Sequence, residues 1–455
     1  MTSNCDLAKS VEDRLLERNQ LCEEFFAREA GRLAYACREM SDRFLRGGRL
    51  LAFGRGSYAT DAQHVSVEFV HPVIVGKRAL PALDLSMLYR PWLEAILRAD
   101  DMVMGFGPPE GDPDVWSALD LARARRAMTF ALPGLEGDYA VTAHTQHPFI
   151  HQEMIEMLYH VLWETVHVFF EHRELGLDTG DAAFLYPFLG QQKQDTDDVV
   201  AEVAESIRLK VQDDAGLRVQ VAATQSEAIS QTAQAMGQCV RNGGKLILFG
   251  NGGSATDAND WALDCVCPPE GYRPIPAVSL ALEPANITAV ANDIGTDVIF
   301  LRQLIAQAQP GDMAVAISTS GGSHNIVMAL EEARKRKLVT AALLGYDGGE
   351  VLRRGLADFP IVVHSDYIPR IQEVQASVYH IIREALVGQA LSPANPGNSS
   401  LLESGRFPFW SKKGVWSKSV GRGEAVSWAK TRLKPAAHNH LLFRIESDRI
   451  PPVRV

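Results

Sequence analysis

Two stretches of sequence decide the fold of this chain: GGRLLAFGRGSYATDAQH at residues 47–64 and GGKLILFGNGGSATDAND at residues 243–260. They align without a gap and are identical at 10 of 18 positions. In both, a short apolar run leads into a glycine-rich turn and then into a helical pattern, which predicts a β-strand, a tight turn and an α-helix. The chain is therefore expected to contain the same α/β unit twice.

Two further pairs of blocks repeat in the same order in both halves. DDMVMGFGPPEGDPDVWSALDLARARR (100–126) corresponds to GDMAVAISTSGGSHNIVMALEEARKRK (311–337), and HPFIHQEMIEMLYHVLW (147–163) corresponds to YIPRIQEVQASVYHIIR (367–383). The shared order indicates a duplicated domain. Alternation of strand, tight turn and helix predicts a parallel sheet with helices on both of its faces, so each copy is expected to belong to the α/β class.

The repeat divides the chain into four parts. We expect one domain over residues 1–173, a linker at 174–195, a second domain over 196–392 and a basic, poorly ordered tail over 393–455. Each domain is expected to begin with helices, at residues 1–46 and 196–242. The runs TAALLGYDGG and FPIVVHSD predict two more strands in the second domain.

The composition is that of a folded protein, with 455 residues of which 46% are hydrophobic and 22% charged. No apolar run approaches the ~18 residues that a membrane-spanning helix needs. The N-terminus lacks the apolar segment of a signal peptide, and six scattered cysteines do not suggest a disulfide framework. These features predict a cytoplasmic protein with no membrane partner.

Charge is unevenly distributed along the chain. Residues 393–455 carry a net charge of +7, and the rest of the chain carries −18. Because affinity for nucleic acid comes largely from cationic side chains, the acidic body argues against nucleic-acid binding by the core. In the tail, Trp410, Trp416 and Trp428 are interleaved with basic residues, a pattern that can bind single-stranded nucleic acid or an acidic partner. We prefer the simpler interpretation of an extension outside the fold.

The second copy resembles the sugar isomerase (SIS) domains, and among them the phosphoheptose isomerases. The resemblance rests on the ordered motifs FGNGGSATDA, AVANDIGTDVIF, AISTSGGSHNIV, LLGYDGGEV and RIQEVQASVYHII, and it covers about residues 200–390. The first copy, at about residues 20–173, resembles a diverged member of the same family. The resemblance implies two tandem SIS domains, each a three-layer α/β/α sandwich of flavodoxin-like type.

The STSGGS loop at residues 318–323 has the features of a phosphate cradle. It follows an apolar strand and opens a helix, so backbone N–H groups and the helix dipole are expected to face a bound anion. The alternative for an isolated loop of this kind is a turn with capping serines, and the resemblance favours the cradle. Hydroxyl donors would come from Ser318, Thr319, Ser320 and Ser323.

The resemblance also implies further substrate-binding residues, namely Asn251, Gly252, Gly253, Ser254, Asn292, Asp293 and Gln372. The first copy departs from this pattern, because Pro108, Pro109 and Glu110 align with three residues of the STSGGS loop. Two prolines remove two amide donors, and a glutamate repels phosphate. Phosphate binding is therefore expected only in the second copy.

Phosphoheptose isomerases typically bind a divalent ion, usually zinc, through a His and a Glu four residues apart and a Gln and a His eight residues apart. The first copy retains this set as His64, Glu68, Gln152 and His160; the second has Asp260, Asp264, Gln372 and His380. Spacings of four and eight place each pair near one helix face, and aspartate is a shorter, harder ligand. The alternative is that the histidines are buried side chains satisfied by ordinary hydrogen bonds.

The resemblance implies an aldose–ketose isomerisation of sedoheptulose 7-phosphate to a heptose 7-phosphate through an enediol. The base would be Glu68 or Asp264, and its partner His160 or His380, respectively. Because neither copy carries every element, we hypothesise a composite site, in which the second copy binds the phosphate and one set of acid/base residues completes it. Two chains would then form a homodimer with four SIS domains.

Two alternatives stay open at this point. The chain could be a sugar-phosphate sensor or scaffold without turnover, since SIS domains also serve as regulatory binding modules. It could also be an isomerase of another phosphosugar, such as a hexose or amino-sugar phosphate. A complete acid/base pair within reach of the STSGGS loop would favour an enzyme.

Overall fold

The computed structural model describes residues 4–73, 77–175 and 196–386. The predicted tail at 393–455 and all but the first two residues of the predicted linker lie outside this part of the chain. None of the helices within it combines the length and the apolar character needed to span a membrane.

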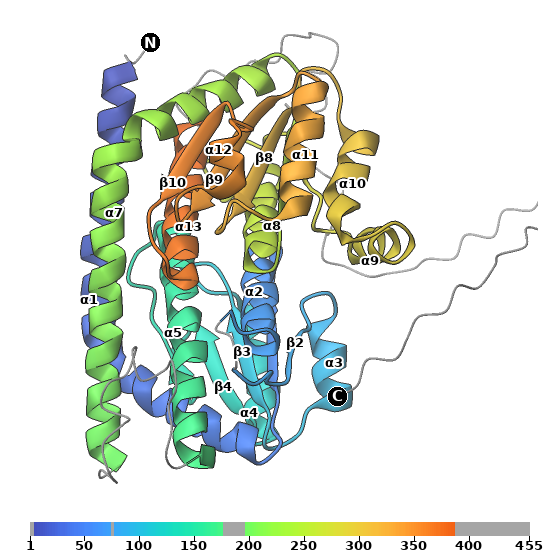
Figure 1. The fold of residues 1–455 in the computed structure, drawn as a ribbon. Coiled ribbons are helices and arrows are strands. Elements are labelled where there is room, and N and C mark those ends of the chain that lie inside the picture. The colour runs from blue at the N-terminus through green and yellow to red at the C-terminus, as the bar shows by residue number, and fades with distance from the viewer. Residues whose placement is uncertain (1–3, 74–76, 176–195, 387–455) are drawn as a thin grey trace, which may run out of the picture. The chain divides into compact units, whose positions relative to one another are not determined.

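Both copies consist of the expected alternation of strands and helices (Figure 1). The first copy contains β1 (Leu50–Gly54), α2 (Ala59–Val70), β2 (Ala82–Asp84), α3 (Tyr89–Ile96), β3 (Met102–Phe106), α4 (Pro113–Ala124), β4 (Met128–Leu132), β5 (Tyr139–Ala140) and α5 (Pro148–Leu175). The second contains β6 (Leu246–Gly250), α8 (Gly253–Val266), β7 (Ala277–Ser279), α9 (Pro284–Asp293), α10 (Ile299–Gln307), β8 (Met313–Ser318), α11 (His324–Lys335), β9 (Val339–Gly345), α12 (Gly349–Arg353), β10 (Phe359–Val363) and α13 (Ile368–Ala385). The long helices α1 (Asn4–Leu45) and α7 (Thr196–Arg241) precede the first and second copies, respectively.

The two sheets have the same topology. The first has the strand order β2-β1-β3-β4-β5 and the second β7-β6-β8-β9-β10, and every pairing is parallel. This is the flavodoxin-like order. The structure therefore confirms the predicted duplication of one α/β sandwich.

Each sheet is covered on both faces because its strands are apolar on both sides. In β1, Leu50 and Ala52 pack in a core with α1, α2 and α5, whereas Leu51 and Phe53 pack in a second core with α3 and α4. The alternation follows from the two-residue period of a strand. The second sheet repeats the arrangement, with α7, α8 and α13 on one face and α10 and α11 on the other.

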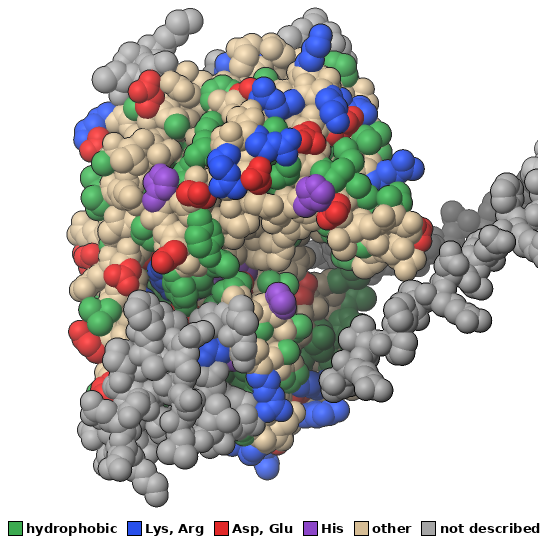
Figure 2. Space-filling model, viewed as in Figure 1, with side chains coloured by type: hydrophobic (Ala, Val, Ile, Leu, Met, Phe, Trp, Pro, Cys, Tyr) green, Lys and Arg blue, Asp and Glu red, His purple; other side chains and the backbone are tan. Residues whose placement is uncertain are grey.

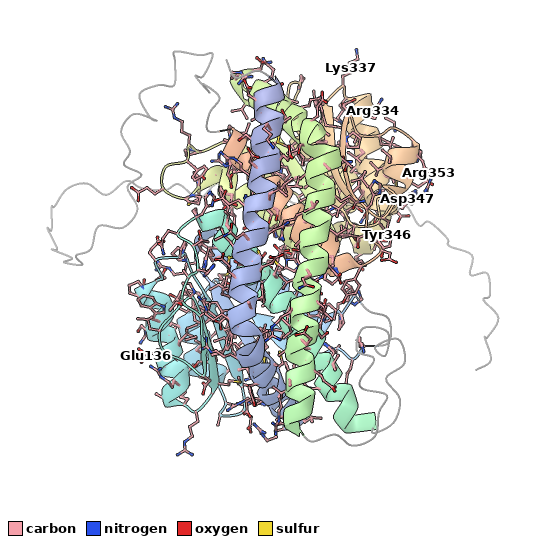
Figure 3. All side chains as sticks on the ribbon, turned by 90° about the vertical axis from the view of Figure 1, so that its left-hand side faces the viewer. Glu136, Arg334, Lys337, Tyr346, Asp347 and Arg353 are labelled. Atoms are coloured by element: carbon pink, nitrogen blue, oxygen red, sulfur yellow. The ribbon has the colours of Figure 1, made fainter. Side chains whose placement is uncertain are left out.

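The helices α1 and α7 lie side by side, and each contributes to both copies (Figure 3). Val11 and Leu15 of α1 belong to the core of the second copy, and Val203 and Ile207 of α7 belong to the core of the first. The opposite halves of these helices pack against their own copies. The helices are therefore antiparallel and join the two sandwiches.

Charges of both signs alternate over the outer surface of α11 and α12 (Figure 2). Exposed arginines there pair with carboxylates, as in the contacts of Arg334 with Asp358 and of Arg353 with Glu350. Exposed pairs of this kind contribute little to stability, so the stabilising electrostatic contacts must be sought between buried groups.

Glu164 provides one such contact and a testable pH dependence. This buried carboxylate on α5 accepts hydrogen bonds from Lys210 and from the Tyr367 hydroxyl, and it lies 3.4 Å from Arg370. Burial by itself raises its pKa, but the charges of Lys210 and Arg370 outweigh burial and lower the pKa from 4.5 to about 2. A lowered pKa stabilises the fold above pH ~4.5, and this contribution is lost as the pH falls towards 2.

We therefore expect Glu164 to account for about 2 kcal/mol of the stability lost between pH 5 and pH 3. Urea unfolding at these two values, for the wild type and Glu164→Gln, measures this contribution. The variant should be less stable at pH 5 and lose less stability on acidification. Equal losses in both proteins would contradict the assignment.

Candidate functional site

Two clusters of ionisable side chains lie where α2 and α5 of the first copy meet α8 and α13 of the second. The first centre comprises His64, Glu68, His160 and Gln372, and the second centre comprises Asp260, Asp264, His380 and Gln152. All eight side chains are buried. Each centre contains three residues of one copy and a glutamine of the other.

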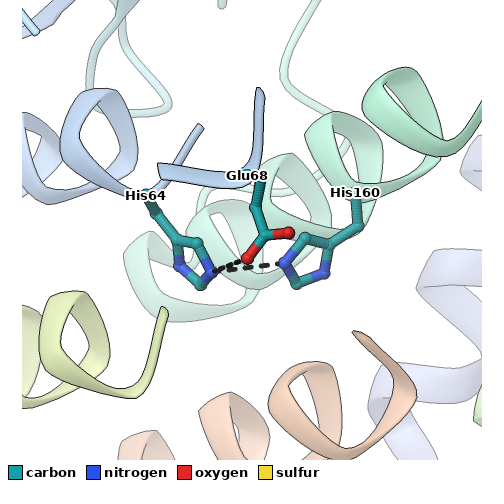
Figure 4. A group of neighbouring side chains, drawn as sticks. All are labelled: His64, Glu68 and His160. Carbon is teal, nitrogen blue, oxygen red and sulfur yellow. Dashed lines mark hydrogen bonds and ion pairs between the residues drawn. The ribbon is translucent and has the colours of Figure 1, made fainter. Parts of the chain in front are cut away.

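In the first centre, two histidines and a glutamate point toward one another (Figure 4). The Nε2 atoms of His64 and His160 are 3.3 Å apart, and Glu68 Oε1 lies 3.7 Å from His64 Nε2. Within the described part of the chain, neither carboxylate oxygen of Glu68 has a hydrogen-bond partner. A buried carboxylate without a partner requires a cation or a proton.

These donors fit a divalent transition metal. Ligand nitrogens bound tetrahedrally to zinc at 2.0–2.1 Å are about 3.3 Å from each other, and the two Nε2 atoms have this separation. Two imidazoles and one carboxylate form a common ligand set for zinc or iron. Burial and the charge of the neighbouring His64 lower the pKa of His160 to about 3. Burial lowers the pKa of His64, but Asp257 and Glu68 outweigh it and raise that pKa well above 6.5, so an ion would have to displace a proton from His64.

The glutamines are exchanged between the copies relative to the sets expected from sequence. Gln372 Nε2 of the second copy lies 3.4 Å from His64 Nε2, and Gln152 Nε2 of the first copy donates to Asp260 Oδ1 at 2.8 Å. The exchange arises because α5 and α13 pack against each other, so the first turns of each reach the other copy's centre. Gln372 Oε1 accepts no hydrogen bond from any described residue, so an amide oxygen is available at the first centre.

The second centre is only partly satisfied by its own protein groups. Asp260 accepts hydrogen bonds from Thr60 Oγ1 at 2.8 Å, from Gln152 and from the Tyr379 hydroxyl at 2.9 Å. His380 Nε2 lies 3.4 Å from Asp260 and 3.3 Å from Asp264. Burial lowers the pKa of His380, but the two carboxylates outweigh it and raise that pKa well above 6.5. Among the described residues, however, both carboxylate oxygens of Asp264 and Nε2 of His380 lack a hydrogen-bond partner, so together with Asp260 these groups could also hold an ion.

The glycine-rich turn of the second copy touches the first centre. A Cβ atom at Gly253 would lie 2.0 Å from Gln372 Nε2 and 2.7 Å from His64 Nε2. The preceding Asn251 exchanges two amide hydrogen bonds, of 2.9 and 3.0 Å, with Asn325 at the start of α11. This turn therefore connects the first centre to the helix that follows the STSGGS loop, and Gly252 and Ser254 lie in the same turn.

The STSGGS loop is shaped by hydrogen bonds between its own serines and glycine amides. Ser318 Oγ accepts a hydrogen bond from the Gly321 amide at 3.1 Å, and Ser320 Oγ accepts one from the Gly322 amide at 3.2 Å. Gly321 has φ +59° and packs so closely on Gly348 that a side chain would collide with its carbonyl oxygen. Ser323 starts α11 without a side-chain cap. The helix amides can therefore bind an anion, and Thr319 and Ser320 are at least partly accessible to solvent.

The corresponding region of the first copy is closed. Asp112 caps α4 by accepting hydrogen bonds from the amides of Asp114 and Val115, so a carboxylate occupies the place of an anion there. Tyr58 stands where the second copy has Ser254, and its pKa is raised by burial and by the neighbouring Asp264. A tyrosine thus lies beside the second centre.

Asn292 and Asp293 form a hydrogen bond of 2.8 Å at the exposed end of α9, apart from both buried centres.

Similarity to known proteins is concentrated in the second copy, where residues 213–345 match the SIS domain family. The chain is 40% identical to the phosphoheptose isomerase of Shewanella sp. (strain ANA-3) over 167 residues, which is 36% of this chain and 85% of the relative. It is 38% identical to that of Trichlorobacter lovleyi over 186 residues, or 41% of this chain and 93% of the relative. The chain belongs to the phosphosugar isomerase (SIS) family.

The SIS fold extends over both copies. The C-terminal domain of glucosamine-fructose-6-phosphate aminotransferase from Francisella tularensis superposes with a TM-score of 0.54, covering 82% of this chain and 95% of that structure. At 10% identity this likeness concerns the fold alone. It shows that the same fold extends over both copies.

Sequence reasoning missed three residues around the SIS centres: Tyr58, Asp257 and Glu373. Asp257 Oδ1 lies 3.4 Å from His64 Nδ1, and Glu373 Oε1 lies 3.0 Å from His160 Nδ1. A signal was available for the two acids, because the repeat alignment pairs them with identical residues of the first copy, Asp61 and Glu153.

Proposed function

We propose that the chain is a phosphosugar aldose–ketose isomerase with one composite active site at the first centre. The observation that carries the proposal is the contact of the Gly253 turn with His64 and Gln372, since it brings the substrate loops of the second copy to the acid/base residues of the first. The curated relatives are phosphoheptose isomerases, which favours sedoheptulose 7-phosphate as substrate and a heptose 7-phosphate as product.

The residues have distinct roles in this proposal. The STSGGS loop binds the phosphate with hydroxyl groups and helix amides. Glu68 is the base that moves a proton between C1 and C2, since a carboxylate keeps one oxygen free when the other holds an ion. His160 is its partner in the centre and directs Nε2 towards the ion rather than carrying a proton on that atom. Burial excludes water, which strengthens the electrostatic interactions that a cation in the centre would make with the developing enediolate charge.

His64, Glu68, His160 and Gln372 would hold a divalent ion, for which zinc fits the nitrogen-rich set. When bound, the ion would polarise the carbonyl and stabilise the enediolate charge. The second centre, with Asp264 and His380, is proposed to be structural, since Asp260 already accepts hydrogen bonds from three protein groups and Asp112 occupies the anion position of the first copy.

An isomerase assay of the purified full chain with sedoheptulose 7-phosphate, with and without zinc, tests the proposal. Turnover is expected, and hexose and amino-sugar phosphates serve as comparison substrates. Phosphosugar binding without turnover of any of them would favour the sensor or scaffold alternative and overturn the proposal.

The phosphate loop can be tested by giving it the sequence of the first copy. Thr319→Pro/Ser320→Pro removes two backbone amide donors, and the first copy tolerates prolines at these positions. We expect the KM for the phosphosugar to rise at least about 10-fold, because charge-assisted hydrogen bonds to phosphate are lost. An unchanged KM in a folded variant would show that the phosphate binds elsewhere.

The close approach of Gly253 provides a test of the composite arrangement. Gly253→Ala places a methyl group against Gln372 and His64, so we expect zinc affinity to fall about 10-fold or more and turnover to fall with it. Ser57→Ala, at the aligned turn of the first copy, is the control. Normal zinc binding by Gly253→Ala would show that the Gly253 turn does not affect ion binding at the first centre, and would contradict the composite arrangement.

A further inference from the structure

We propose that two carboxylates of the second copy, Asp257 and Glu373, are positioning residues for the metal-type histidines of the first copy. The inference rests on one part of the proposed function, namely that the first centre binds an ion. It assigns to the second copy the task of orienting His64 and His160, in addition to supplying Gln372.

The contacts of the two imidazoles carry this inference. The Nε2 atoms of His64 and His160 meet at 3.3 Å in the centre, while the opposite nitrogens face carboxylates: Nδ1 of His64 faces Asp257 at 3.4 Å, and Nδ1 of His160 faces Glu373 at 3.0 Å. All four side chains are buried. A carboxylate at Nδ1 keeps the proton on that nitrogen, so Nε2 presents its lone pair to an ion.

Glu373 is itself fixed in place. Its Oε2 pairs with Arg370 Nη1 at 2.6 Å on the same helix, which leaves Oε1 directed at His160. Arg370 also lies 3.4 Å from Glu164. The carboxylate therefore cannot turn away from the imidazole without leaving a buried arginine incompletely paired.

The second centre supplies a matched control within the same molecule. His380 Nδ1 faces Glu153 Oε1 at 3.0 Å, and Glu153 is held by Arg18 and Ser377. This repeats the His160–Glu373 pair with the copies exchanged. Glu153→Gln and Glu373→Gln thus remove the same charge beside a buried histidine and a buried arginine, but only Glu373 faces the first centre.

The test measures the zinc affinity of the full chain by competition with a chromophoric chelator. We expect Glu373→Gln and Asp257→Asn each to weaken zinc binding about 10- to 100-fold, and Glu153→Gln to change it less than about threefold. Unfolding by urea is measured in parallel, because Glu373→Gln and Glu153→Gln should destabilise the fold alike. The visible spectrum of the cobalt-substituted protein should change in Glu373→Gln and remain as in the wild type in Glu153→Gln.

Two results would overturn the inference: wild-type zinc affinity in both Glu373→Gln and Asp257→Asn, or equal weakening by Glu373→Gln and Glu153→Gln. Glu373→Asp keeps the charge and is expected to bind zinc more tightly than Glu373→Gln. If Glu373→Gln does not fold, the zinc affinity of Asp257→Asn, compared with that of Glu153→Gln, still tests the inference. If the wild type binds no zinc, the first centre is not a zinc site and the inference fails. Zinc binding without isomerase turnover would refute the proposed function alone.

Discussion

Glu68→Gln is expected to lower kcat for sedoheptulose 7-phosphate about 10³-fold, since an amide cannot accept the proton that the isomerisation moves. The native carboxylate is buried 3.7 Å from His64 Nε2, and neither of its oxygens has a hydrogen-bond partner among the described residues. The loss should appear in steady-state kinetics at saturating substrate and zinc. Thermal unfolding of the variant shows whether the fold is kept.

Asp264→Asn is the matched variant, because Asp264 is the residue of the second copy that aligns with Glu68. Asp264 lies in the second centre, 3.3 Å from His380. We expect its kcat to stay within about threefold of the wild type. The reverse outcome, an active Glu68→Gln and an inactive Asp264→Asn, would move the active site to the second centre.

Arg18→Met is expected to destabilise the fold by about 3–5 kcal/mol, because it removes the buried cation that two buried carboxylates share. Arg18 on α1 binds Glu153 of α5 at 2.8 Å and Glu384 of α13 at 2.8 Å, and all three side chains are buried. Burial alone would raise the pKa of Glu153, but the charge of Arg18 outweighs it and lowers that pKa. Urea unfolding at pH 7 measures the loss.

Arg14→Met provides the comparison, because Arg14 binds the same Glu384 from a side chain that is 40% exposed. Exposed pairs contribute no more than about 1 kcal/mol, so the Arg14 variant should remain close to the wild type. Similar losses in both variants would show that the cost comes from Glu384 rather than from burial of Arg18.

The repeat in the sequence was sufficient to predict the fold. The blocks at 47–64 and 243–260 each contain a strand, a turn and a helix, and their shared order predicted two equivalent sheets. The matching strand orders of the two sheets confirm this prediction. The short elements β2, α3, α9 and α10 were not predicted, because each contains few apolar residues and their hydrophobic periodicity is weak.

The composition of the candidate site was only partly predictable. Spacings of four residues identify pairs such as His64 with Glu68, because these lie on one turn of one helix. No local pattern shows that Gln372 faces His64, or that Glu373 faces His160, since those contacts depend on how α13 packs against α5. Tyr58 was not predicted, because its position beside the second centre depends on its proximity to Asp264, which lies more than 200 residues away in the sequence.

The sharing of α1 and α7 between the two sandwiches also constrains how the protein folds during synthesis. The core of the first copy includes Val203 and Ile207, so a nascent chain that ends at residue 173 has all of the first sheet but an incomplete core. Val11 and Leu15, which are synthesised before the first sheet, find their native partners only when the second copy emerges. Folding domain by domain from the N-terminus is the usual order; here both sandwiches reach their final packing only late in translation.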